Sequence, residues 1–219
     1  TRYIGDWSSD VCSSDLDLMN NLTKRIFSSL ILIPLALYFI ISGTYMLIFF
    51  TSICLFVSCY EWHMMTKKKT YRVYGFLFLI FSFYTFYELS LGLSLVFFII
   101  LICISTDIGG YVFGKIFKGP KLTKISPKKT YAGMIGGYFL SLICLTIISN
   151  YINYTNIPIQ FFILTLIIST VSQIGDIIIS YFKRLSKVKD TGKIIPGHGG
   201  LLDRIDGMIF AFPIFYLIE

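Results

Sequence analysis

Three aspartates in the C-terminal third of the chain are the residues best suited to chemistry. Asp203 and Asp206 are three positions apart, so both carboxylates point the same way if the segment is helical. Asp176 precedes a run of isoleucines, where an unpaired carboxylate would be costly. Together the three could converge on one divalent ion, and such carboxylate oxygens suit Mg²⁺. A metal held in this way neutralises phosphates and polarises a phosphorus atom under attack.

A glycine-rich run, PGHGG at positions 196–200, lies between these carboxylates. Its glycines let backbone N–H groups approach phosphates without interference from a Cβ atom. Arg204 offers a bidentate fork to phosphate. Five further basic residues flank the run, namely Lys183, Arg184, Lys187, Lys189 and Lys193. Carboxylates, glycines and cations in this order favour transfer of a phosphate-containing group.

Two further segments carry residues of the same kind. Ser180 and Lys183 follow Asp176 by four and seven positions, which places all three on one helical face. Upstream, the segment SPKKT at 126–130 leads into an apolar run. Its proline and two lysines suit an anion site at a helix start. Asp107, at the end of another apolar run, is equally well explained as a helix-end residue and as part of the site.

The elements that position these residues are membrane helices. Of the 219 residues, 55% are hydrophobic and 14% are charged, and the mean hydropathy is +0.75. The apolar residues lie in long runs, so lipid is the solvent for most of the chain. We expect an all-α, polytopic integral membrane protein with about seven transmembrane helices and cytoplasmic catalytic loops. The predicted helices cover residues 26–41, 45–62, 73–88, 91–107, 131–150, 159–182 and 208–218.

The charges set the expected topology and the domain boundary. Residues 1–18 are polar, lack the pattern of a signal peptide, and resemble a translated sequencing adapter rather than native sequence. Residues 19–219 then form a single membrane-embedded domain. All Lys and Arg residues of this domain fall on one side of the predicted helices. The positive-inside rule places that side, with the N-terminus and both polar loops, in the cytoplasm.

The motif between Ser180 and Asp206 resembles the signature of the phosphatidate cytidylyltransferase family. It has the form S-x-x-K-R, then K-D, then P-x-H-G-G-x-x-D-R-x-D. Two upstream blocks are also similar to that family, D-x-G-G-Y at 107–111 and I-S-P-K-K-T-Y at 125–131. The signature fixes many positions over a short stretch, so the resemblance is specific, and it extends over essentially all of residues 19–219.

The resemblance implies transfer of CMP from CTP to phosphatidic acid, giving CDP-diacylglycerol and pyrophosphate in phospholipid biosynthesis. It implies Mg²⁺, with or without a second cation, bound by Asp176, Asp203 and Asp206. The catalytic set would be Asp176, Ser180, Lys183, Arg184, His198, Asp203, Arg204 and Asp206. The substrate-binding set would be Lys128, Lys129, Lys189, Gly199 and Gly200. The expected location is a bacterial inner membrane, and a homodimer is left open.

Three other functions compete with this hypothesis. A CTP-dependent lipid kinase would share the nucleotide features but phosphorylate an alcohol. A transporter or channel would place ionisable residues near the middle of the bilayer, whereas here they cluster at helix ends. A structural scaffold gives no reason for the glycine-rich, acidic and basic loop. The many Phe and Tyr residues suit a lipid-facing surface rather than stacking of nucleic acid bases, so no nucleic acid partner is expected.

Overall fold

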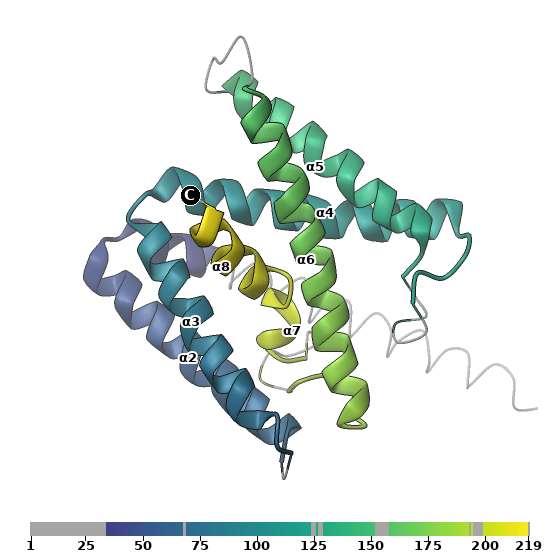
Figure 1. Ribbon diagram of the computed structural model, residues 1–219. Helices are drawn as coiled ribbons and strands as arrows, with labels where there is room; N and C mark the ends of the chain where they lie inside the picture. Colours follow the sequence, from purple (N-terminus) through teal and green to yellow (C-terminus); the bar gives the residue numbers. More distant parts are fainter. Residues whose placement is uncertain are drawn as a thin grey trace, which may run out of the picture.

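The long apolar runs of the sequence fold into helices in the computed structural model of the protein (Figure 1). The structure describes residues 34–67, 69–123, 126, 129–151, 158–192, 194 and 199–218. Its helices are α2 (Thr44–Met65), α3 (Arg72–Ser90), α4 (Leu93–Phe117), α5 (Tyr131–Tyr151), α6 (Ile159–Leu185), α7 (Leu202–Ile205) and α8 (Met208–Ile218). Residues 34–41 are also helical. These described ranges contain no strand and one isolated bridge, between Lys121 and Thr130.

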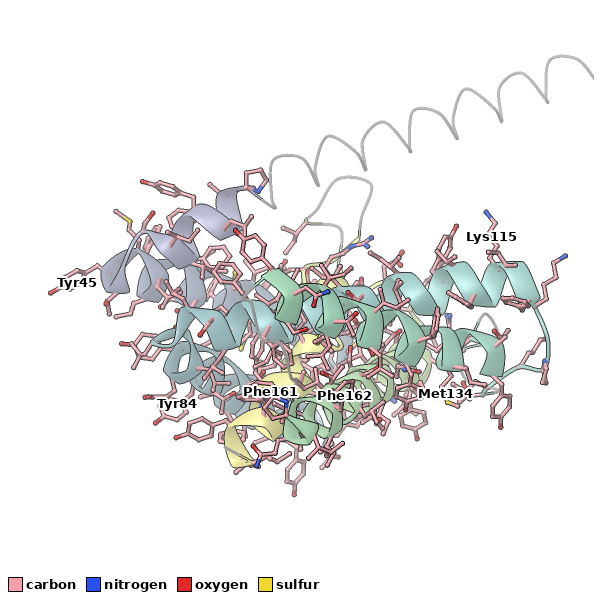
Figure 2. All side chains as sticks on the ribbon, turned by 90° about the horizontal axis from the view of Figure 1, so that it is seen from above. Tyr45, Tyr84, Lys115, Met134, Phe161 and Phe162 are labelled. Carbon is pink, nitrogen blue, oxygen red and sulfur yellow. The ribbon has the colours of Figure 1, made fainter. Side chains whose placement is uncertain are left out.

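Five of these helices, α2 to α6, are long and apolar enough to cross a bilayer. This confirms the predicted class, an all-α polytopic membrane protein. Apolar side chains project outward around the bundle, with Tyr45 and Tyr84 at its rim (Figure 2). Helix α8 has only 11 residues, and the predicted helix 26–41 begins outside the described residues. The count of seven spans therefore stays a prediction, and the proposed tail at 1–18 also lies outside them.

Glycine residues end two of the helical segments where the sequence predicted breaks. Gly43 has a φ of 101°, a conformation that favours glycine, and it separates residues 34–41 from α2. Gly92 precedes α4. The end of α4 was predicted wrongly, because the helix continues from 107 to Phe117. Asp107 is therefore a residue within the helix, and the polar connection to α5 is shorter than expected.

The extension of α4 is stabilised by close packing against α5. A Cβ atom on Gly109 would overlap the backbone oxygen of Gly136, and one on Gly133 would lie 2.6 Å from the oxygen of Gly110. Small residues at such positions let two membrane helices approach each other at backbone distance. The glycines that suggested a loop in the sequence are therefore packing residues, and they bring Asp107 close to the start of α5.

The C-terminal helices fill the space between the other elements (Figure 1). Helix α8 lies between α3 and α6, where Ser82 Oγ donates a hydrogen bond of 2.7 Å to Ile209 O. The rings of Phe78 and Phe210 pack against each other in a tilted arrangement, with centroids 4.5 Å apart. The connection before α8 packs on α6, since a Cβ on Gly175 would lie 2.9 Å from Asp206 O. This packing places the short helix α7 and Asp206 beside the charged end of α6.

Candidate active site

A pocket of about 320 Å³ lies between α4, the start of α5 and α6. Its lining contains both polar and apolar residues. The polar lining residues are Thr106, Asp107, Ser126, Lys129, Thr130, Gln173 and Asp176, and the larger apolar ones are Leu122, Met134 and Ile177, with Tyr111. A pocket that combines charged and apolar side chains suits an amphiphilic ligand.

An ion pair between Lys129 and Asp176 sits in this pocket. Lys129 Nζ lies 2.6 Å from Asp176 Oδ2, and the two side chains are 23% and 32% exposed. Ser180 Oγ donates a weak hydrogen bond of 3.4 Å to Asp176 Oδ1. The structure therefore brings together three predicted site residues, Lys129, Asp176 and Ser180.

A second ion pair joins α6 to α7. Lys183 Nζ lies 2.8 Å from Asp203 Oδ1, and these side chains are 13% and 9% exposed. Asp203 Oδ2 accepts hydrogen bonds from Thr191 N at 2.8 Å, Thr191 Oγ1 at 3.0 Å and Gly200 N at 3.1 Å. Protein donors therefore occupy both oxygens of Asp203. The sequence predicted instead that Asp203 faces a shared ion and that the Gly200 N–H faces phosphate.

Asp206 follows α7, and charged groups from both ion pairs influence its carboxyl. Burial raises the pKa of its carboxyl well above its usual range, the negative charge of Asp176 raises it further, and Lys183 opposes the shift. The negative charge of Asp107 also raises the pKa of Asp206, and the positive charge of Lys129 lowers it, both more weakly than Asp176 and Lys183 do. A carboxylate that is partly buried and surrounded by other carboxylates is a candidate for binding a cation.

Mg²⁺ was expected on three aspartates. The described part of the chain contains no group of three or more His, Cys, Asp or Glu residues placed to hold a metal ion. Mg²⁺ commonly binds only one or two protein carboxylates together with substrate phosphates. Asp107 and Asp176 line one pocket, and the negative charges of both raise the pKa of Asp206. These residues fit a cation that arrives with a nucleotide, and the metal stays a prediction.

The other predicted site residues lie around these two ion pairs. Arg184, Lys189 and Arg204 are exposed. Gly199 has a φ of 86°, and a Cβ there would lie 3.2 Å from Asp203 Oδ2, so glycine is required by the backbone and by packing on Asp203. Lys128 and His198 lie outside the described residues.

Sequence reasoning missed several residues of the site. Glu61 of α2 is 1% exposed and accepts hydrogen bonds from the segment that contains Thr191 and α7. Its signal was its rarity, because it is the first acidic residue after Asp17 in a largely apolar stretch. Gln173 lines the pocket, and so does Asp107, for which the sequence left two explanations open.

Fold and site together define an all-helical membrane protein with a charged, phosphate-compatible pocket at one end of three helices. A sequence model described as the Cytidylyltransferase family matches residues 70–219. The chain belongs to this family, which confirms the resemblance carried by the motif at 180–206. The match includes both ion pairs and the pocket, whereas Glu61 lies before it.

Curated relatives carry a more specific name. The phosphatidate cytidylyltransferase of Staphylococcus saprophyticus is 39% identical over 130 residues, covering 59% of this chain and 50% of that protein. The phosphatidate cytidylyltransferase of Rickettsia typhi is 45% identical over 124 residues, covering 52% and 54%. That of Staphylococcus aureus strain COL is 42% identical over 140 residues, covering 63% and 54%. The chain thus spans about half the length of the curated relatives it matches.

Proposed function

We propose that this chain transfers CMP from CTP to phosphatidic acid, forming CDP-diacylglycerol and pyrophosphate. The observation that carries the proposal is the Lys129–Asp176 pair in a pocket lined by both charged and apolar side chains. A lipid phosphate and a nucleotide triphosphate are both anions, so the protein must bring them together with cations rather than with a strong base. Family membership and the names of the relatives support the same reaction.

The reaction joins a phosphate oxygen of the lipid to the α-phosphorus of CTP. The bond between the α-phosphorus and its bridging oxygen to the β-phosphate breaks, and that electron pair leaves with pyrophosphate. In this proposal Lys129 holds the lipid phosphate beside the pocket. Lys183, with exposed Arg184, Lys189 and Arg204, binds the triphosphate and the leaving group.

A magnesium ion would supply neutralisation of the triphosphate and of the leaving pyrophosphate when it is bound. We assign the magnesium ion to Asp176 and Asp206, and the charge of Asp107 also acts on Asp206. Asp203 is assigned to holding Lys183 and the Thr191 backbone, because its oxygens already accept hydrogen bonds from the protein. Lys128 and His198, outside the described residues, stay in the predicted set, as does a second cation.

The proposed location is the inner membrane of a bacterium, with the pocket on the cytoplasmic side. Five membrane-length helices support integration, and the relatives named above are bacterial. The positive-inside rule supports the cytoplasmic side, because the predicted topology places Lys129 and Lys183 together with the other Lys and Arg residues. This arrangement would let acyl chains stay in the bilayer while the headgroup meets CTP from the cytosol. A homodimer stays an untested prediction.

The test supplies the purified 219-residue chain with labelled CTP and one of two lipids, phosphatidic acid or a polyprenol, with and without Mg²⁺. The proposal predicts CDP-diacylglycerol and pyrophosphate only with phosphatidic acid and only with the metal. Formation of a phosphorylated polyprenol and CDP would instead support the lipid kinase. Absence of turnover with both lipids, in protein that retains its helical circular dichroism, would refute the proposed function.

A further inference from the structure

Glu61 is a buried carboxylate to which the proposed reaction assigns no role. It lies in α2 beside Trp62, is 1% exposed, and belongs to a helix that is otherwise almost entirely apolar. Burying an ionisable group costs about several kcal/mol unless polar partners replace the water molecules that it loses. Glu61 belongs to neither the Lys129–Asp176 pair nor the Lys183–Asp203 pair. The hydrogen-bond donors around it are neutral, two backbone N–H groups and one hydroxyl.

Those donors come from both sides of one segment. Glu61 Oε1 accepts a hydrogen bond of 2.9 Å from Leu201 N, and Oε2 accepts one of 2.9 Å from Leu202 N. Thr191 Oγ1 lies 3.1 Å from Oε2. Thr191 precedes the glycine-rich run in the sequence, and Leu201 and Leu202 follow it. One side chain of α2 therefore ties together the two ends of the segment that carries the family motif.

Thr191 connects Glu61 to the second ion pair. Its hydroxyl donates to Glu61 Oε2 at 3.1 Å, its backbone N–H donates to Asp203 Oδ2 at 2.8 Å, and Asp203 pairs with Lys183. A continuous chain of hydrogen bonds thus runs from α2 through Thr191 to α7 and α6. Displacing Glu61 would move Asp203, and with it the turn that ends at Asp206.

Two glycines of the segment are explained by the same carboxylate. A Cβ atom on Gly192 would lie 2.6 Å from Glu61 Oε1, and one on Gly200 would overlap Thr191 Oγ1 and lie 2.5 Å from Glu61 Oε2. Real Cβ atoms do not approach other atoms so closely, so a larger residue would displace Glu61 at position 192, and Thr191 together with Glu61 at position 200. Neither glycine has a positive φ, so the space beside Glu61, rather than the backbone conformation, requires glycine.

We propose that Glu61 is a positioning residue: its carboxylate anchors Thr191, Leu201 and Leu202 to α2 and so holds Asp203 and Asp206 against α6 for nucleotidyl transfer. The anchoring is independent of the reaction, whereas its catalytic consequence rests on the proposed function. The family match begins at residue 70, so Glu61 supports the motif from outside the matched segment.

The anchoring is tested by hydrogen exchange on the purified full chain. Glu61→Gln keeps the shape of the side chain, but its amide N–H₂ group would face one of the backbone N–H groups that donate to Glu61. Hydrogen bonds to a charged group contribute about 1.5–3 kcal/mol, so the amides of Leu201 and Leu202 should exchange at least about tenfold faster in this variant. Thr170→Val is the matched control, because it removes the 2.9 Å hydrogen bond between α5 and α6 to Tyr138 far from this segment. Unchanged exchange at Leu201 and Leu202 in Glu61→Gln would overturn the proposal.

The catalytic consequence is tested by steady-state kinetics with CTP and phosphatidic acid, normalised to folded protein. A residue that positions reacting groups should lower kcat more than it raises KM, and we expect at least about a tenfold loss in kcat for Glu61→Gln and none for Thr170→Val. An unchanged kcat per folded molecule would reduce Glu61 to a structural residue and overturn the positioning role. If the wild-type chain makes no CDP-diacylglycerol, the proposed function fails, while the exchange measurement still decides the anchoring.

Discussion

Asp203 and Asp206 should respond in opposite ways to the same substitution. The two aspartates are three positions apart and look equivalent in the sequence. Asp203 is paired with Lys183 and accepts hydrogen bonds from Thr191 and Gly200. Asp206 is partly buried among other carboxylates, and the pKa of its carboxyl is raised. In the absence of metal, Asp203→Asn should therefore destabilise the protein, whereas Asp206→Asn should not.

The size of the Asp203 effect follows from its partners. Removing one member of a buried ion pair costs about 3–5 kcal/mol. An asparagine also turns its N–H₂ group either toward Lys183 or toward the N–H groups of Thr191 and Gly200, so a donor meets a donor in both orientations. The side chains of Lys183 and Asp203 are still 13% and 9% exposed, so solvent screens part of this loss. We therefore expect a destabilisation of about 3 kcal/mol, at the lower end of the range.

The Asp206 effect has the opposite sign because of linkage. A carboxyl whose pKa is raised in the folded state binds its proton more tightly there than in the unfolded state. The wild type should thus lose stability, relative to Asp206→Asn, as the pH rises from the ordinary value of about 3.8 through the raised pKa. Both variants can be compared by SDS titration of the detergent-solubilised protein with a chelator present, followed by circular dichroism. Equal stability changes for the two variants would refute the distinct roles assigned to them.

Three further predictions come from other contacts. Gly192→Ala should lower the stability and the turnover of the protein by displacing Glu61, and this loss should be much smaller in a Glu61→Ala background, where the Cβ has room. Additive effects of the two substitutions in a double-mutant cycle would contradict this. Gly109→Val should separate α4 from α5 and lower activity and thermal stability together. The control Gly119→Val, at a position where a Cβ meets no neighbour but φ is 94°, should affect only the local connection, and wild-type stability of Gly109→Val would exclude the close packing. Mn²⁺ affinity, measured by electron paramagnetic resonance, should rise with pH as Asp206 loses its proton, and a pH-independent affinity would remove Asp206 from the proposed metal site.

The sequence predicted the helical membrane architecture well because hydropathy reports it directly. Runs of apolar residues identified the helices, and Gly43 and Gly92 marked breaks that the structure confirms. The end of α4 was not predictable from the same rules. Gly109 and Gly110 read as breakers in isolation, but inside a membrane bundle they serve close contact with Gly133 and Gly136.

The chemical residues were predicted by type, but their partners were not. The predicted site includes Lys129, Asp176, Lys183 and Asp203, and the structure pairs these residues two by two. Spacing alone could not show that Asp203 is saturated by Thr191 and Gly200, since those contacts depend on how the segment folds back. Glu61 was missed because it is distant in sequence and has no motif of its own.

The proposed reaction depends most directly on the pocket that holds Lys129 beside Asp176. The decisive measurement is the formation of labelled CDP-diacylglycerol from CTP and phosphatidic acid by Lys129→Ala, compared with Lys67→Ala, which removes an exposed lysine at the end of α2. Removing a charged phosphate contact should cost about 3 kcal/mol, so we predict at least about a hundredfold loss of kcat/KM for Lys129→Ala and wild-type activity for Lys67→Ala. Equal activity in the two variants would contradict the assignment of the reaction to this pocket.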